Sequence, residues 1–282
     1  MSWLVFALAF WIGAWALNTY LANSRWRGSL FVRVLVPMLF GVTLIVLWEG
    51  IVRGLGVSPV ILPAPSTVAQ TFAASTDILW EDFRQTVLKG ALSGFAIGVL
   101  AAFVTAILID RSAFLTQGLL PIGNFVAALP IVGIAPILVS WFGFDWQSKA
   151  AVVVVMVFFP VLVNTVQGLR ETDAMQRDLM RTYAATYFDT LLKLRLPAAL
   201  PFVFNGLKIA TTLALIGAIV AEYFGSPTRG MGFRISTGVG SLSIDLVWAE
   251  IAVAAMAGTA FYGLVAWAEK RVTFWHPSHR RS

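Results

Sequence analysis

Few side chains in this sequence could carry out covalent or metal chemistry. The chain has no cysteine, which excludes disulfides, thiolate metal sites and a cysteine nucleophile. Its two histidines, His276 and His279, lie three residues apart near the C-terminus with no carboxylate beside them. That spacing can contact a metal ion, but a solvated tail is the favoured interpretation. We therefore expect no catalytic residues, no metal site and no enzymatic activity in this chain.

The sequence also lacks a recognisable nucleotide site. A phosphate-binding loop of the P-loop kind needs Gly-Lys followed by Ser or Thr. None of the five lysines is followed by either residue. If ATP drives this protein, another subunit must bind the nucleotide.

Charged residues are scarce in the apolar parts of the chain. Glu49 and Arg53 are four residues apart, a spacing that pairs them on one helix face. Glu222, Glu250 and Asp110 fall within about a turn of the ends of apolar stretches, where we expect their side chains to reach water. A carrier driven by protons or sodium usually has charged groups in mid-membrane. The pattern therefore indicates a passive conduit whose energy comes from outside the chain.

The elements that position these residues are predicted to be membrane spans. Apolar residues make up 59% of the chain and charged residues 12%, against roughly 25% charged in soluble proteins. The net charge of +6 would suggest nucleic acid binding in a soluble protein, but here we assign it to cytoplasmic loops and expect no nucleic acid partner. We predict an all-α polytopic membrane protein with about seven transmembrane helices of roughly 20 apolar residues each, near residues 3–22, 33–52, 88–109, 115–142, 149–168, 205–224 and 246–268.

The predicted span 115–142 contains helix-breaking residues. Pro130 and Pro136 each remove a helix hydrogen bond, and Gly133 loosens the backbone between them. We expect this span to be kinked or broken. Broken spans tend to line a pathway, although neighbouring helices can equally repair a simple proline kink.

Two glycine-rich regions suggest different roles. In the span 88–109, Gly90, Gly94 and Gly98 repeat every four residues, which lets another helix approach closely. The Gly- and Ser-rich residues 225–245 are instead predicted to form an irregular or shallow re-entrant excursion, or a plain exposed loop.

Most of the 20 basic residues fall on alternate loops, which the positive-inside rule assigns to the cytoplasm. The N-terminus is then outside, the C-terminus is inside, and residues 169–204 form the longest cytoplasmic excursion. Within it, residues 174–196 could form an amphipathic helix that ends at Leu196-Pro197, because proline disfavours helix in the preceding residue. Taken alone, this helix could lie on the membrane surface.

This segment resembles the cytoplasmic "EAA" loop of permease subunits of ABC importers, where an acid and two alanines precede a glycine and then a Leu-Pro pair. Setting that pair on Leu196-Pro197 places the acid on Asp178 and the glycine on Ala184. The two alanines are replaced by the bulkier Leu179 and Met180. Ala184 adopts the positive φ of a glycine less readily.

The wider chain is similar to the branch of that family that takes up nitrate, taurine, alkanesulfonates and thiamine precursors. The similarity extends from about residue 60 to 270 and is carried, in order, by LPAPSTV (62–68), ALPIVGIAPILVSWFG (128–143), SKAAVVV (148–154), NTVQGLR (164–170), LPAALPFVFNGLKIA (196–210) and AEYFGSPTRGMG (221–232). The span 3–22 has no counterpart in the six-helix core of this branch and is interpreted as an added anchor.

The resemblance implies a type I permease subunit with an N-terminal anchor at 1–30, a transmembrane domain at 31–275 and a cytoplasmic tail at 276–282. It implies that coupling to an ATPase in the loop 169–204 rests on Asp178, Arg181, Tyr183, Ala184, Asp189 and Pro197. The translocation pathway is expected to include Asn124, Pro130, Gly133, Pro136 and Asn164.

The implied function is uptake of a small polar or anionic solute across the bacterial inner membrane. The implied partners are two ATPase subunits that bind ATP and Mg, a periplasmic or lipid-anchored solute-binding protein, a second copy of the chain and the lipid bilayer. No cofactor is expected in this chain. The alternative is a stand-alone secondary carrier or channel, which uptake into vesicles without any ATPase would establish. Which solute is carried depends in this family mainly on the binding protein.

Overall fold

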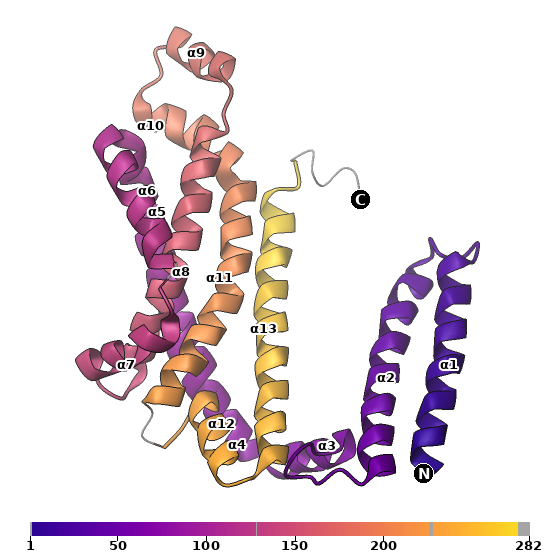
Figure 1. The fold of residues 1–282 in the computed structure, drawn as a ribbon. Helices are drawn as coiled ribbons and strands as arrows, with labels where there is room; N and C mark the ends of the chain where they lie inside the picture. The colour runs from indigo at the N-terminus through magenta and orange to yellow at the C-terminus, as the bar shows by residue number, and fades with distance from the viewer. Residues whose placement is uncertain (1, 128, 226–227, 276–282) are drawn as a thin grey trace. The chain divides into compact units, whose positions relative to one another are not determined.

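The computed structural model describes residues 2–127, 129–225 and 228–275, and these contain helices and no strands (Figure 1). The prediction of an all-α polytopic membrane protein is confirmed. The chain forms two compact units, one of Met1–Leu79 with Thr237–Ile251 and the other of Trp80–Ser236 with Ala252–Ser282. The predicted tail at 276–282, with both histidines, lies outside the described residues.

Six helical stretches among the described residues are long and apolar enough to cross a membrane. Two of them are composite, because a π-helical segment joins successive α-helices within one continuous stretch. The six are α1 (Ser2–Asn23), α2 (Leu30–Leu55), α4–η1–α5 (Thr76–Phe83, Arg84–Ala91, Leu92–Arg111), α8 (Trp146–Arg170), α10–η2–α11 (Tyr187–Thr190, Leu191–Arg195, Leu196–Phe224) and α13 (Ile244–Val272).

The remaining one of the seven predicted spans, 115–142, is broken into α6 (Ala113–Ala127) and α7 (Ile131–Phe142). Pro130 caps α7 in an extended conformation, with φ −68° and ψ 112°. Proline has no N–H to donate and disfavours helix in the residue before it, which explains why the helix stops here. Pro136 lies inside α7, so only the first of the two prolines, Pro130, interrupts the helix.

In the first unit, α1 packs along α2, and α3 (Pro65–Ala74) follows them. The predicted pairing of Glu49 with Arg53 is confirmed. Ser66 joins the pair: its hydroxyl donates to Glu49 Oε1 at 2.7 Å and its backbone N–H donates to Oε2 at 2.9 Å. That residues 1–30 form a separate anchor stays a prediction.

The core of the second unit lies between α5, α8 and α11. Small and β-branched residues fill it, among them Ala102, Val157 and Ala214, which are fully buried. Gly94 allows α5 to approach α8 closely, because a β-carbon there would lie 2.8 Å from the carbonyl oxygen of Ala150. The predicted close approach of another helix to the glycine-rich span is therefore confirmed.

A buried polar cluster closes the end of this unit at which α11 finishes. Glu222, in the last turn of α11, is 1% exposed and accepts hydrogen bonds from the Thr86 hydroxyl at 2.7 Å and from the Gly232 N–H at 3.0 Å. Asp82 accepts from the Gly230 N–H at 2.6 Å and from Arg234 Nε at 2.7 Å. These bonds hold the chain that follows α11 against η1 and α4.

The expectation that Glu222, Glu250 and Asp110 reach water is wrong, because both glutamates are buried and the Asp110 side chain is only 8% exposed. Residues 231–240 are also not irregular, since they form α12 (Met231–Gly240). The N–H groups that precede or begin this helix donate to buried carboxylates and a hydroxyl, which stabilises it despite its three glycines.

Candidate functional site

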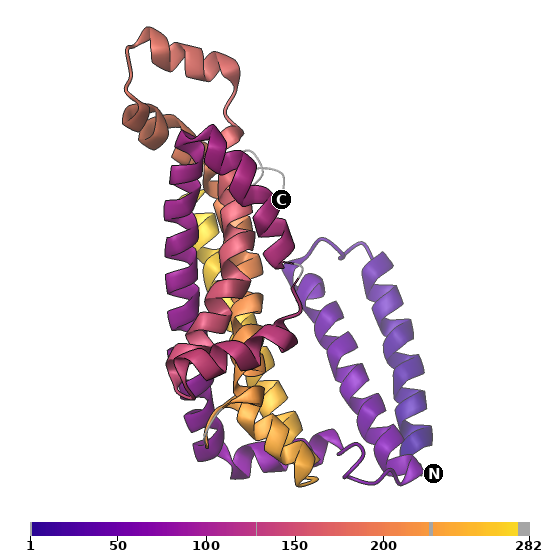
Figure 2. The same ribbon diagram turned by 60° about the vertical axis from the view of Figure 1, so that its left-hand side comes forward.

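The cytoplasmic excursion predicted at 169–204 begins with α9 (Ala174–Thr182). A capping box fixes its first turn: the Asp173 carboxylate accepts from the Ala174 N–H at 2.9 Å, and the Asp173 N–H donates to Gln176 Oε1 at 3.1 Å. Figures 1 and 2 show that α9 projects beyond the ends of α5, α8 and α11, in the same unit. The sequence therefore specifies a short, well-capped helix held away from the core.

This helix has an apolar stripe that is largely exposed in the described structure. Met175, Leu179 and Tyr183 follow one another at four-residue steps and are 79%, 57% and 76% exposed. No residue of α9 is buried. Asp178 and Arg181 form an exposed ion pair at 3.1 Å beside the stripe. An exposed row of large apolar side chains on a polar helix is typical of a surface that another protein covers.

The chain turns sharply after α9, so the predicted single helix at 174–196 is wrong. Ala184 has φ +51°, in the left-handed region, and its N–H donates to the Arg181 carbonyl at 2.9 Å. A continuous helix cannot include a residue in this conformation. The resemblance placed the family's glycine at this position, and the backbone here has the geometry that favours glycine.

A second short helix, α10, starts after this turn. Thr186 caps it: the Thr186 hydroxyl lies 2.5 Å from Asp189 Oδ2 and accepts from the Asp189 N–H at 3.2 Å. Lys193 donates to the other carboxylate oxygen of Asp189 at 2.7 Å. The side chain of Asp189 thus stabilises the helical segment to which it belongs.

A partly buried ion pair joins this segment to the end of α5. Asp110 accepts two hydrogen bonds from Arg195, at 2.7 and 2.5 Å, and a third from the Tyr187 hydroxyl at 2.8 Å. Arg195 also donates through Nε to the carbonyl of Leu169, at the end of α8, at 3.0 Å. The two charged side chains are 8% and 15% exposed. One carboxylate and one guanidinium therefore tie α10 and η2 to both α5 and α8.

Arginine and aromatic stacking extends this joint. The guanidinium of Arg111 lies 4.5 Å from the ring centroid of Tyr187 and 5.0 Å from that of Phe188. Such contacts contribute about 0.5–1 kcal/mol each when exposed. Below them, Leu191 packs in a small core with Leu169 and Ala199.

The predicted helix end at Leu196-Pro197 is also wrong. Leu196 has helical angles, φ −62° and ψ −48°, and the helix continues from η2 through Pro197 into α11. Pro197 lies in the first turn of α11, where a missing N–H is tolerated. The π-helical segment just before it already departs from α-helical hydrogen bonding. The excursion is thus continuous with a membrane-spanning helix.

Sequence reasoning named Asp178, Arg181, Tyr183, Ala184, Asp189 and Pro197, and the structure places all six on this segment. It did not predict that Asp110, Arg195, Tyr187 and Arg111 contact one another and form one joint. Asp110 lies 77 and 85 residues from its two partners in the chain. A single sequence carries no signal for such a contact, although the position of Asp110 at the end of an apolar span was visible.

The residues predicted to line a pathway do not gather at one place. Pro130, Gly133 and Pro136 belong to α7 or its cap. This helix packs near Val152 of α8, whereas Asn164 lies roughly 18 Å further along α8 at 1.5 Å per residue. The side chain of Asn124 lies outside what the structure describes.

Asn164 instead lies near a pocket of about 400 Å³ in the second unit, whose mainly apolar wall carries a few polar side chains. Its side-chain oxygen accepts a hydrogen bond from Asn205 of α11 at 3.0 Å. Asn205 lines the pocket with Lys208 and Tyr262, and Lys208 forms an ion pair with Glu269 at 2.9 Å. Sequence reasoning did not identify these pocket residues.

The described residues thus combine several membrane-crossing helices, a projecting helix with an uncovered apolar stripe, and no cluster of three or more metal-ligating side chains. They define a polytopic membrane protein with an exposed helical surface. Residues 94–274 match the family described as binding-protein-dependent transport system inner membrane component. The chain belongs to this family, and it is a permease subunit of an ABC importer of type I.

Individual relatives agree with this assignment. A probable ABC transporter permease protein of Haemophilus influenzae is 35% identical over 237 residues, which cover 84% of this chain and 96% of that protein. The formylaminopyrimidine transport permease protein ThiX of Halalkalibacterium halodurans is 35% identical over 71% of this chain and 80% of its own length. The taurine transport system permease protein TauC of Escherichia coli is 27% identical over 89% and 94%. These relatives are transport subunits, and the chain is a transport subunit.

Proposed function

We propose that this permease forms the translocation pathway for a small polar or anionic solute, and that α9 is the surface gripped by an ATPase partner. The observation that carries the coupling assignment is the exposed stripe of Met175, Leu179 and Tyr183 on a helix that projects from the unit. A helix of this kind fits a groove on a partner, with its apolar face inward. Asp178 and Arg181 would then contact the rim of that groove.

The solute class is inferred from the relatives. The names of the relatives specify formylaminopyrimidine, riboflavin, aliphatic sulfonates, taurine and bicarbonate, all of which are small molecules that are polar or anionic. The pocket lined by Asn205, Lys208 and Tyr262 offers hydrogen-bond donors of the right kind for such a solute. We propose that this pocket and the neighbouring Asn164 belong to the pathway, together with α6 and α7, whose break is at Pro130.

The mechanical link is the joint at Asp110. When the ATPase moves α9, α10 moves with it, and Arg195 transmits that motion to α5 through Asp110 and to α8 through Leu169. Rigid-body rotation of packed helices is a common way to switch between two open states. The same motion passes through Pro197 into α11, because η2 and α11 form one unbroken helical stretch there.

We further propose that the assembly contains two ATPase subunits, which bind ATP and Mg, and a solute-binding protein on the outer side. A second copy of this chain would complete the pathway. In this arrangement the segment around α9 and the C-terminus face the cytoplasm, and the N-terminus faces outside, as the distribution of basic residues indicates.

Replacing Leu179 with Asp tests the coupling surface. Because the side chain is 57% exposed and makes no core contact, the change should leave the membrane helices folded but reduce retention of the ATPase at least tenfold in co-purification. Leu242→Asp is the matched control: Leu242 is 60% exposed and lies after α12, so the ATPase should be retained.

Equal retention of the ATPase by both variants would contradict the coupling role of α9. Solute uptake into vesicles that contain this chain without any ATPase would contradict the importer function and support a stand-alone carrier.

A further inference from the structure

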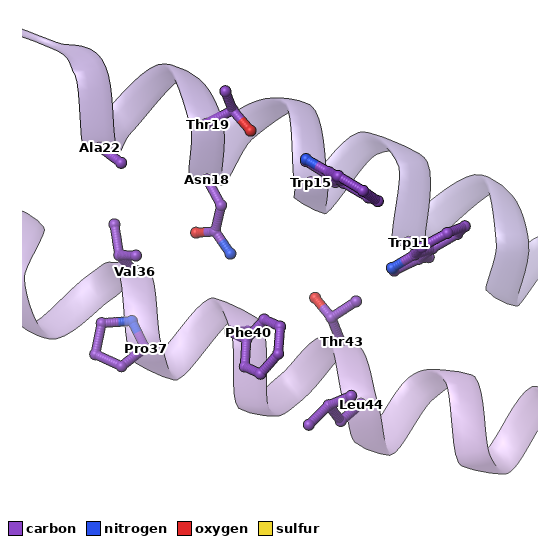
Figure 3. Close-up of a pocket in the computed structure, with 10 residues that line it drawn as sticks. All are labelled: Trp11, Trp15, Asn18, Thr19, Ala22, Val36, Pro37, Phe40, Thr43 and Leu44. Carbon is purple, nitrogen blue, oxygen red and sulfur yellow. The ribbon is translucent and has the colours of Figure 1, made fainter.

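The helices α1 and α2 enclose a lateral pocket with a basic end. They are closest near the start of α1, where Gly50 faces Ala7 and a β-carbon on Gly54 would lie 2.8 Å from Cβ of Leu4. In the other half of the pair they separate and leave a cavity of about 700 Å³. Figure 3 shows Trp11, Trp15 and Asn18 of α1 facing Phe40 and Thr43 of α2 across this space.

The pocket wall is apolar and remains uncovered in this unit. Trp15 and Phe40, which face one another across it, are both more than half exposed. Both helices are apolar enough to cross a membrane. At membrane depth, hydrocarbon is the medium that such a wall contacts.

Positive charge lies at the end of the pocket where the two helices connect. Residues 24–29 join α1 to α2 and contain Arg25 and Arg27, and Arg33 lies in the first turn of α2. All three arginines are exposed, and among the described residues none takes part in an ion pair with a carboxylate. The sequence has no Asp or Glu before Glu49. The three charges are therefore not compensated by any acid in this pair of helices.

We propose that this pocket binds one acyl chain of an anionic phospholipid whose phosphate is held by Arg25, Arg27 and Arg33. The charge and the apolar cavity lie in the order that a lipid requires, with the guanidinium groups at the membrane surface and the cavity beneath them. Arginine presents a planar fork of donors that suits phosphate oxygens. Basic groups between transmembrane helices bind anionic headgroups by the same arrangement.

Asn18 distinguishes a lipid from a protein occupant. Its side-chain oxygen is buried at the pocket and has no hydrogen-bond partner among the described residues. An acyl chain gives this oxygen no donor, so Asn18→Leu should leave lipid binding unchanged or strengthen it. A transmembrane helix docking through a hydrogen bond to Asn18 would instead be lost in this variant.

The test uses the purified full-length chain in neutral detergent, with dioleoylphosphatidylglycerol and dioleoylphosphatidylcholine added separately and bound lipid counted by native mass spectrometry. The wild type should retain the anionic lipid preferentially. Arg25→Gln with Arg27→Gln should weaken that retention by about 30-fold, because each basic residue near a lipid surface contributes about a fivefold factor and the two factors multiply. Arg84→Gln with Lys89→Gln, which removes two exposed charges elsewhere, is the matched control and should retain the lipid.

A pocket-filling variant supplies the second measurement. Ala22 lines the pocket and is exposed, so Ala22→Trp should reduce retention of both lipids without removing charge. The proposal is overturned if the wild type retains the two lipids equally, or if the Arg25 and Arg27 variant behaves like its control. It is also overturned if Ala22→Trp leaves lipid binding intact and changes the oligomeric state, which would make the pocket a contact between copies.

Discussion

Asp110 is the residue on which the geometry of the projecting segment depends most directly. Its carboxylate accepts three hydrogen bonds from Arg195 and Tyr187, and it has almost no contact with solvent. Charged hydrogen bonds of this kind are stronger than neutral ones. Removing the charge would leave the Arg195 guanidinium partly buried without its counter-ion, which costs more than the pair itself contributes.

We predict that Asp110→Asn destabilises the protein by about 3 kcal/mol and uncouples transport. Asparagine keeps the size of the side chain but can satisfy only part of the hydrogen bonding of Arg195 and Tyr187. Thermal unfolding in detergent measures the first effect. ATP-dependent solute uptake at matched ATPase content measures the second effect. Uptake should fall severalfold, because α9 still binds the ATPase but its motion is no longer transmitted through Asp110.

Asp178→Asn is the control for this prediction. The Asp178–Arg181 pair is exposed on both sides, and exposed pairs contribute about 0.2–1 kcal/mol. This variant should unfold within a few degrees of the wild type. Asp178 belongs to the proposed coupling surface, so this control applies to stability alone. If Asp110→Asn unfolded like Asp178→Asn and transported solute like the wild type, Asp110 would not be a transmission residue.

At the scale of elements, the turn between α9 and α10 is the least relaxed part of the segment. Ala184 holds φ +51°, a conformation that costs a non-glycine residue roughly 1 kcal/mol. Met180, Arg181 and Leu179 supply the carbonyls that accept the N–H groups of Ala185, Ala184 and Tyr183. These backbone bonds hold the turn in place.

We predict that Ala184→Gly strengthens ATPase binding by up to about fivefold, since glycine adopts this φ without strain and the turn becomes better populated. Ala184→Val should weaken binding by at least as much, because a β-branched residue disfavours the left-handed region. Titration of the ATPase against the permease in detergent gives both values. Identical affinities for the two variants would show that the turn does not limit docking.

The elements that sequence predicted best are those with a long apolar run. The spans near 3–22, 33–52 and 149–168 appear as α1, α2 and α8, because hydrophobic length alone determines a membrane-crossing helix. The break near Pro130 was predicted as one of two outcomes, since the steric effect of proline is local. The position of the projecting segment also followed from its motif.

The rest depended on contacts that one sequence does not reveal. The helix predicted at 174–196 failed at Ala184, whose φ is set by the surrounding hydrogen bonds and is unusual for alanine. The Gly- and Ser-rich loop became α12 because distant carboxylates at Asp82 and Glu222 accept its N–H groups. Composition favoured an irregular loop, and tertiary contacts overrode it.

At the scale of the whole molecule, the direction in which the chain crosses the membrane determines which partner meets which surface. Between α9 and the turn after α12 the chain crosses once, through the stretch Tyr187–Phe224. The two ends of this stretch must therefore lie on opposite sides. From the basic residues around α9 we predict that this end faces the cytoplasm.

Single-cysteine labelling checks this orientation. The natural chain has no cysteine, so Thr182→Cys and Ser241→Cys each introduce the sole thiol, both at exposed positions. A membrane-impermeant maleimide added to intact cells should label Ser241→Cys fully and Thr182→Cys only after the cells are broken. The reverse pattern would place α9 outside and exclude an intracellular ATPase as its partner.

The continuous α11 connects two distant features of the second unit. It begins beside the Asp110 joint and ends at Glu222, which holds Thr86 and Gly232. Its 29 residues make a rod roughly 43 Å long.

Such a rod acts as a lever. If the end of α11 beside Asp110 moves when the ATPase closes on nucleotide, a tilt of about 5° around the midpoint displaces the end near Glu222 by roughly 2 Å. The bonds of 2.7 and 3.0 Å at Glu222 cannot stretch that far and survive. Each tilt of this size, driven by the ATPase, would thus break the hydrogen bonds at the Glu222 end of α11. The stiffness of the helix alone would carry the motion from one end to the other.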